Sequence, residues 1–324
     1  MLKRAIRFTV ATAILTLACS AGGAQTYPNG QVRLIVPTPA GGVTDTMARI
    51  VAQRLGETLN QTVIVDNRPG GNGGVGAQAV ERSPADGLTL LVTSDATITA
   101  NPFLTNRLMY NASAFTPIAV LCRGMPVLVV NASSVAAKST QELIALAKAK
   151  PGTLNYGSYG VGTYAHLSME DFKQRTGTDI VHVPFRGAAP AANALLSDSI
   201  NMLLLNLSSI ADHEKTGKVR ILAAAGAKRI EARPDLPTIA EAGVPGFQTS
   251  VWFAMFGPPN MPPELTAKIH ADVSKVLDLP QTKEFFAKNS FERVPLSPSE
   301  FAKLVADDSK HWEAIIKQVG AKLE

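Results

Sequence analysis

Short runs of apolar, often β-branched residues alternate along this chain with longer segments whose apolar residues recur at helical spacing. The predicted strands are residues 32–36, 62–65, 88–93, 127–130, 154–156, 180–183, 200–205 and 219–224. The predicted helices between them are residues 45–59, 75–82, a segment opening at 139, residues 164–175 and a segment beginning near 190. Because strands separated by helices form parallel βαβ units, this pattern predicts an α/β fold with mainly parallel sheets flanked by helices.

Capping residues mark two of the helix starts. Ser139 and Glu142 have the spacing of a capping box. Near the end of the chain, Ser297, Pro298 and Glu300 occupy the N-cap, N1 and N3 positions of a final helix with a strong apolar face. The proline-rich stretch at 258–263 predicts a loop before another helix.

The N-terminus has the three-part layout of a secretory signal peptide. Three basic residues among the first seven precede an uncharged apolar run at 8–18, and small residues follow. We expect a signal peptide at 1–24, with cleavage before Gln25. The run is shorter than the ~20 residues of a membrane span. Cys19 could instead accept a lipid, but Thr16 stands where a lipobox usually has leucine.

Composition narrows the class of the exported protein. The sequence has 31 basic and 26 acidic residues, and removing the leader lowers the basic count to 28, so nothing favours nucleic-acid binding. Cys122 is then the one remaining cysteine, which excludes an intramolecular disulfide and a cysteine-rich metal site. A mature chain of about 300 residues exceeds what one core usually serves, so we expect two lobes.

The first candidate binding loop follows the first strand and leads into the first helix. Gly41 and Gly42 let a ligand approach the backbone, and the free N–H groups of a helix start attract an anion. Asp45 in the first helical turn would repel a carboxylate beside it, so we expect it to act through water or on a donor of the ligand. The alternative is a tight glycine turn followed by an ordinary capping aspartate.

Two further loops have the same strand, glycine and helix order. Residues 156–163 contain three glycines, and Ser158 and Thr163 add hydroxyl donors without charge. His166 follows on the next helix, where a packed or solvent-facing role is more common than a ligand contact. Residues 183–190 contain Arg186, the one cation of the three loops, which we expect at the surface or between lobes.

Other chemistry has weaker support. Gly71, Gly73 and Gly76 match a dinucleotide fingerprint, with Asp95 about 20 residues on, but residues 67–70 separate the glycines from the strand, so the turn is not the tight one required. The five histidines lack metal-ligand spacing, so we expect no metal and no cofactor. Ser158 and His166 could meet across one loop, which leaves an exported hydrolase or lyase as the alternative function.

The whole mature chain resembles the Bug-type periplasmic solute-binding proteins of tripartite tricarboxylate transporters, which bind di- and tricarboxylates, acidic amino acids and aromatic acids. The motifs that carry the resemblance are residues 32–37, 40–42 with Asp45 and 48–49, 66–70, 157–167, 182–187, 233–238, 241–247 and 252–253. Thr38 and Leu205 differ from the family's usual residues in the cleft, so the identity of the carboxylate does not carry over.

The resemblance implies a type II flytrap in which the chain crosses the hinge twice. The implied first lobe is residues 25–123 and 222–324, and the second is residues 124–221. Ligand contacts are expected at Ala40, Gly41, Gly42, Thr44, Asp45, Thr93, Ser94, Ser158, Gly162, Thr163, Ala188 and Asn206.

The sequence therefore predicts a monomeric periplasmic receptor that captures a small carboxylate, performs no chemistry on it and delivers it to integral-membrane transporter subunits. A receptor that passes the same acid to a signalling partner is the other alternative, and sequence does not separate it from transport.

Overall fold

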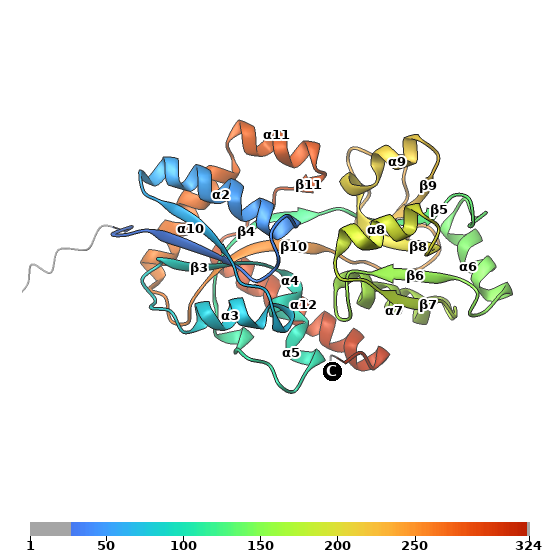
Figure 1. Ribbon diagram of the computed structural model, residues 1–324, viewed down its shortest axis with the longest axis horizontal. Coiled ribbons are helices and arrows are strands. Elements are labelled where there is room, and N and C mark those ends of the chain that lie inside the picture. The colour runs from blue at the N-terminus through green and yellow to red at the C-terminus, as the bar shows by residue number, and fades with distance from the viewer. Residues whose placement is uncertain (1–26, 323–324) are drawn as a thin grey trace, which may run out of the picture.

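Two mixed β-sheets, each flanked by helices, form the two lobes of the protein in the computed structural model, which describes residues 27–322 (Figure 1). The predicted signal peptide and Cys19 lie outside the described residues. We call the part built on the six-stranded sheet the first lobe and the part built on the five-stranded sheet the second lobe.

The six-stranded sheet has the strand order β11-β4-β10-β3-β1-β2. Its strands are β1 (Val32–Val36), β2 (Val63–Asn67), β3 (Thr89–Ser94), β4 (Thr116–Gly124), β10 (Val251–Gly257) and β11 (Phe291–Glu292). The helices that belong with it are α2 (Val43–Leu59), α3 (Gly74–Glu81), α4 (Asp95–Thr99), α5 (Asn101–Leu104), α10 (Pro263–Leu277), α11 (Pro280–Lys288) and α12 (Pro298–Val319).

The five-stranded sheet has the strand order β7-β6-β8-β5-β9. Its strands are β5 (Pro126–Asn131), β6 (Asn155–Ser158), β7 (Val181–Pro184), β8 (Met202–Asn206) and β9 (Val219–Ala224). Its helices are α6 (Thr140–Ala149), α7 (Tyr164–Thr176), α8 (Ala188–Leu196) and α9 (Ala211–Lys215).

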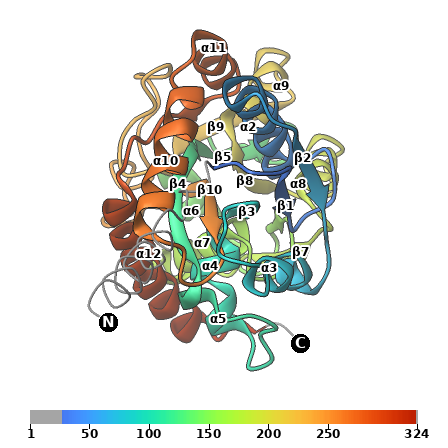
Figure 2. The ribbon, with the colours of Figure 1, turned by 90° about the vertical axis from the view of Figure 1, so that its left-hand side faces the viewer.

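Side-chain alternation along the strands gives each sheet two apolar faces. In β1, Val32 and Leu34 pack in one core with α2 and α10, whereas Ile35 packs in another with α3 and α12. Figure 2 looks at the first lobe and shows helices on both sides of its sheet. In the second lobe, α8 and α9 cover one face and α6 and α7 the other.

The chain passes between the lobes through antiparallel strands, which makes both sheets mixed. β1 pairs in parallel with β2 and β3, and β6 pairs in parallel with β7 and β8. β4 and β10, which enter and return from the second lobe, are antiparallel to each other and bulged. Gly124 ends β4 directly before β5 begins, so the chain passes from the first sheet to the second there.

The second crossing lies later than the predicted boundary at residue 222. That position falls inside β9, which pairs with β5 as far as Ala224. The following segment stays with the second lobe, because Thr249 Oγ1 accepts a hydrogen bond from Ser168 Oγ on α7 at 2.7 Å and Phe247 packs edge-on against Phe172. The return to the first lobe is therefore at β10.

Both predicted capping residues are confirmed. Ser139 accepts a hydrogen bond from the Glu142 N–H at 3.2 Å. Ser297 and Glu300 form a reciprocal capping box at the start of α12. α12 then runs from the first lobe to pack against α7 of the second.

Candidate functional site

The first-lobe binding loop, residues 37–45, is held by a buried carboxylate. Asp45 accepts hydrogen bonds from the Gly41 N–H at 2.9 Å, from Arg49 Nε at 2.9 Å and from Asn67 Nδ2 at 3.0 Å. Burial raises the pKa of this carboxyl, but the hydrogen bonds outweigh it and hold the pKa below its ordinary value. Both Asp45 oxygens are thus engaged within the protein, whereas Ala40 and Gly42 are exposed.

The other predicted residues of the first lobe lie at the carboxyl ends of neighbouring strands. β1 and β3 pair in parallel, so the 37–45 loop and Ser94 leave the same edge of the sheet. Thr93 is fully buried, and its hydroxyl donates to Thr97 Oγ1 at 2.7 Å. Thr44 is buried in the first turn of α2. Thr38, in the same loop, has a buried hydroxyl oxygen without a hydrogen-bond partner among the described residues.

The second-lobe binding loop, residues 158–163, is folded on itself and on two histidines. Thr163 Oγ1 donates to the Gly160 carbonyl at 2.8 Å. The Gly162 N–H donates to His166 Nδ1 at 3.2 Å. Ser158, which is fully buried, bonds His182 Nε2 at 2.7 Å. Uncharged side chains therefore hold the polar groups of this loop in position.

The serine partner differs from the sequence-based alternative. Ser158 pairs with His182 on β7, not with His166. His182 was not singled out, although it lies level with Tyr156 in the parallel β6–β7 ladder, two residues before Ser158 on the same face. Strand register would have found the pair once the order of the strands was known. No carboxylate among the described residues bonds His182, so the orienting acid of a catalytic triad is missing there.

The remaining predicted residues lie at the same edge of the second sheet. Ala188 is exposed at the first position of α8, and the neighbouring Arg186 is exposed and forms no ion pair within residues 27–322. Asn206 ends β8 and is buried. Its side-chain oxygen has no partner among the described residues and lies against Gly124, where an added Cβ would be 2.6 Å from it. The amide therefore sits directly at the first chain crossing.

The two lobes touch through the second-lobe loop. Gly162 packs against Leu104 of α5 so closely that a Cβ on this glycine would collide with the leucine Cδ1. Burial and the charge of Asp95, on α4, raise the pKa of Tyr164 at the start of α7. Asp95 is itself buried beside Asp308, and burial and that second carboxyl raise its pKa. Sequence reasoning considered Asp95 only for a nucleotide and missed its burial near Asp308.

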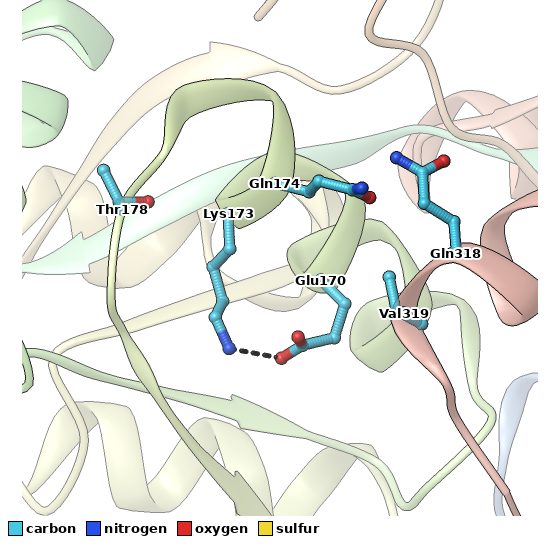
Figure 3. A pocket seen from close by; sticks show the side chains of 6 residues that line it. All are labelled: Glu170, Lys173, Gln174, Thr178, Gln318 and Val319. Carbon is cyan, nitrogen blue, oxygen red and sulfur yellow. Dashed lines mark hydrogen bonds and ion pairs between the residues drawn. The ribbon is translucent and has the colours of Figure 1, made fainter.

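Two cavities lie away from these loops. The larger, about 310 Å³, is lined by Glu170, Lys173, Gln174, Thr178, Gln318 and Val319 where α7 meets the end of α12 (Figure 3). The smaller, about 200 Å³, lies between α2 and α11. Neither is lined by a predicted ligand residue. Within residues 27–322, no helix has the length and hydropathy of a membrane span, and no group of three acidic, histidine or cysteine residues is placed to hold a metal.

Comparison with known proteins identifies the family. The model of the tripartite tricarboxylate transporter family receptor matches residues 47–321. Protein BugT of Bordetella pertussis is 33% identical over 303 residues, covering 93% of each chain. A solved R. palustris protein, Rpa4515 with adipate, is 34% identical with a TM-score of 0.83 and covers 92% of this chain and all of its own.

Other solved relatives share the fold. MatC from Rhodopseudomonas palustris with bound malate is 29% identical with a TM-score of 0.79, over 90% of this chain and all of that one. The periplasmic binding protein BugD is 27% identical with the same TM-score, over 92% of this chain and all of its own. The two-lobed fold and the predicted resemblance are thus confirmed, and this chain belongs to the receptor family of the tripartite tricarboxylate transporters.

Proposed function

We propose that this protein is a periplasmic receptor that captures a small carboxylate between its two lobes and delivers it to integral-membrane transporter subunits. The observation that carries the proposal is the placement of the loops. Glycine- and hydroxyl-bearing loops leave the carboxyl ends of β1 and β3 in one lobe and of β6 in the other, and Gly162 touches the first lobe. The two relatives solved with adipate and malate support the same class of ligand.

The proposed site comprises the exposed Ala40, Gly41 and Gly42 with Thr44, and Thr93 and Ser94, facing Ser158, Gly162, Thr163, Ala188 and Asn206 across the cleft. The donors to the carboxylate are the backbone N–H groups of these loops that the protein leaves free and the Asn206 amide, so the site avoids the cost of burying a lysine or arginine. The N–H groups of Gly41 and Gly162 and the hydroxyls of Thr93 and Thr163, which donate within the protein, hold the shape of the site. Asp45 acts by holding the loop. Binding to both lobes at once favours the closed state, because the ligand gains its full contacts only there.

The localisation and assembly state follow from the same proposal. The signal peptide directs export, cleavage occurs before Gln25, and the mature protein works as a monomer. An intact Met1 on protein recovered from the native envelope would contradict this part of the proposal.

A thermal-shift screen tests the function. The purified mature protein is mixed with di- and tricarboxylates, acidic amino acids and aromatic acids, with neutral sugars as controls. A ligand that binds the native state at a hundred times its Kd should stabilise it by about 2.7 kcal/mol. The proposal fails if no acid raises the Tm, or if a bound acid is consumed in a turnover assay, which would instead support the exported hydrolase or lyase.

A further inference from the structure

Two stacked histidines lie directly beneath the second-lobe binding loop. The His166 and His182 rings have centroids 4.3 Å apart and an interplanar angle of 29°. Tyr156 stacks on the other side of His182, at 4.8 Å and 17°. His166 is buried and His182 half-buried. The three stacked rings thus form one continuous aromatic layer between α7, β6 and β7.

The hydrogen bonds of the stack fix the protonation state of one ring. His166 Nδ1 accepts the Gly162 N–H, and a ring nitrogen that accepts a hydrogen bond carries no proton. If Nδ1 were protonated, it would be a donor facing the Gly162 N–H, which is also a donor. The hydrogen bond between them would then be lost. His182 differs, because its Nε2 can either donate to Ser158 Oγ or accept from it. His166 is therefore the sensitive member of the pair.

The surrounding charges do not favour an imidazolium. Glu170 is the acid near the pair, but it accepts a hydrogen bond from Tyr156 Oη at 2.5 Å. It also accepts one from Lys173 Nζ at 2.7 Å (Figure 3). From α12, uncharged Gln318 and Val319 line the adjacent cavity. Burial and Lys173 lower the pKa of His166 against the pull of Glu170. Burial and His166 lower the pKa of His182 to about 4.

We propose that His166, supported by His182, is a positioning residue that holds the 158–163 loop only while it is neutral, so that ligand affinity falls in acid. The inference rests on the proposed function, because it takes this loop to be part of the ligand site. While the Gly162 N–H donates to His166 Nδ1, protonation of that nitrogen is unfavourable. Once the loop is released, His166 can take up a proton. The anchored state is accordingly fully favoured above about pH 6.5 and loses stability as the pH falls below that.

The first test needs no ligand. In full-length mature protein labelled with ¹⁵N-glycine and ¹³C-histidine, NMR should show the Gly162 amide resonance moving with the titration of His166. Both midpoints should lie below pH 6.5. A Gly162 amide that ignores this titration, or a His166 that titrates at or above pH 6.5, overturns the inference whether or not the protein binds a carboxylate.

The second test separates titration from structure. His166→Asn places a side-chain oxygen at the same number of bonds from the backbone as Nδ1, so it keeps the acceptor and removes the proton site. With adipate and malate as calorimetric probes, the wild-type Kd should rise about tenfold between pH 7 and pH 5, and that of His166→Asn by less than about threefold. Protonation of the probe affects both proteins equally.

His213→Asn on α9, outside this cluster, is the matched control and should follow the wild-type profile. Equal pH dependence in His166→Asn and the wild type overturns the inference. If neither acid binds at any pH, neither is a ligand of this protein, and the NMR titration alone decides the role of His166.

Discussion

A side chain holds each of the two binding loops in place, and it is charged in the first lobe but neutral in the second. Residues 39–42 of the first loop are exposed and the loop is held by the carboxylate of Asp45, whereas residues 158–163 are buried or half-buried and are held by neutral imidazoles. In each case one glycine N–H, that of Gly41 or Gly162, is bound by the side chain four residues further on. The acceptor of this glycine N–H is therefore a charged carboxylate in the first lobe and an uncharged imidazole in the second.

This difference explains how the carboxylate of Asp45 can lie beside a proposed anion-binding site. The charge of Asp45 is neutralised locally by Arg49, at 2.9 Å, before a ligand arrives. In the second lobe, the cation near the histidines that hold the loop is Lys173, which is already paired with Glu170. An ionised anchor there would leave a buried charge without a partner, which costs several kcal/mol.

The largest difference between the loops should come from their glycines. Gly41 and Gly162 both have left-handed backbone angles, with φ of 90° and 82°. An added Cβ meets nothing within 4 Å at Gly41 but collides with Leu104 at Gly162. We expect Gly162→Ala to lower the free energy of unfolding by about 2–4 kcal/mol, and Gly41→Ala by about 1–2 kcal/mol.

Denaturant unfolding measures both variants, and titration with a bound acid should show at least a tenfold larger loss of affinity for Gly162→Ala. The Gly162→Ala, Leu104→Ala double variant is the control, since it removes the colliding methyl groups and should recover part of the lost affinity. Equal losses for the two glycine variants would mean that Leu104 does not limit closure of the lobes.

The next effect is on the charged anchor. Asp45→Ala leaves the Gly41 N–H and Asn67 Nδ2 without their acceptor, so we expect a loss of about 2 kcal/mol in unfolding free energy and weaker ligand binding. Asp45→Asn preserves the shape and one acceptor and should lose less. If chemical denaturation finds Asp45→Ala as stable as the wild type, the loop is held by other contacts.

Much of the fold was predictable because local sequence determines it. The βαβ alternation and the two N-caps depend on residues within a few positions of each other, and the structure confirms them. The reciprocal bond of a full capping box forms between Ser297 and Glu300, whereas Glu142 accepts from the Lys138 N–H instead. β4 and β10 were not among the predicted strands. β10 is buried along its whole length and therefore lacks the alternation of a half-exposed strand.

The site was predictable only in part, for the same reason. The glycines and hydroxyls were visible as loop motifs, and Arg49 lies four residues from Asp45, within reach of a helical-pair argument. Asn67 and His182 act from neighbouring strands 22 and 24 residues away from their partners. Those contacts exist only once strand order and register are set.

As the pH is lowered, the His166 contact that holds the second loop should be lost before the Asp45 contact that holds the first. The lowered histidine pKa values favour the native state above about pH 6.5, and this contribution declines as the pH falls toward 4. The pKa of Asp45 is also lowered, so its contribution is fully present above about pH 4 and declines only below that. Glycine-resolved hydrogen exchange should therefore lose protection at Gly162 first and at Gly41 in stronger acid. Loss of both amides at one pH would contradict separate anchoring.

The smallest expected effect tests the hydroxyl that closes the second loop. Thr163→Val keeps the branched shape but removes the hydrogen bond to the Gly160 carbonyl, so we expect a loss of about 1 kcal/mol in unfolding free energy. If the hydroxyl also reaches the ligand, affinity should fall tenfold or more, because hydrogen bonds to a charged ligand are the stronger ones. Thr163→Ser retains the hydroxyl and should restore both quantities. Calorimetry and unfolding on the three proteins distinguish a loop-closing hydroxyl, which changes stability alone, from one shared between the loop and the carboxylate.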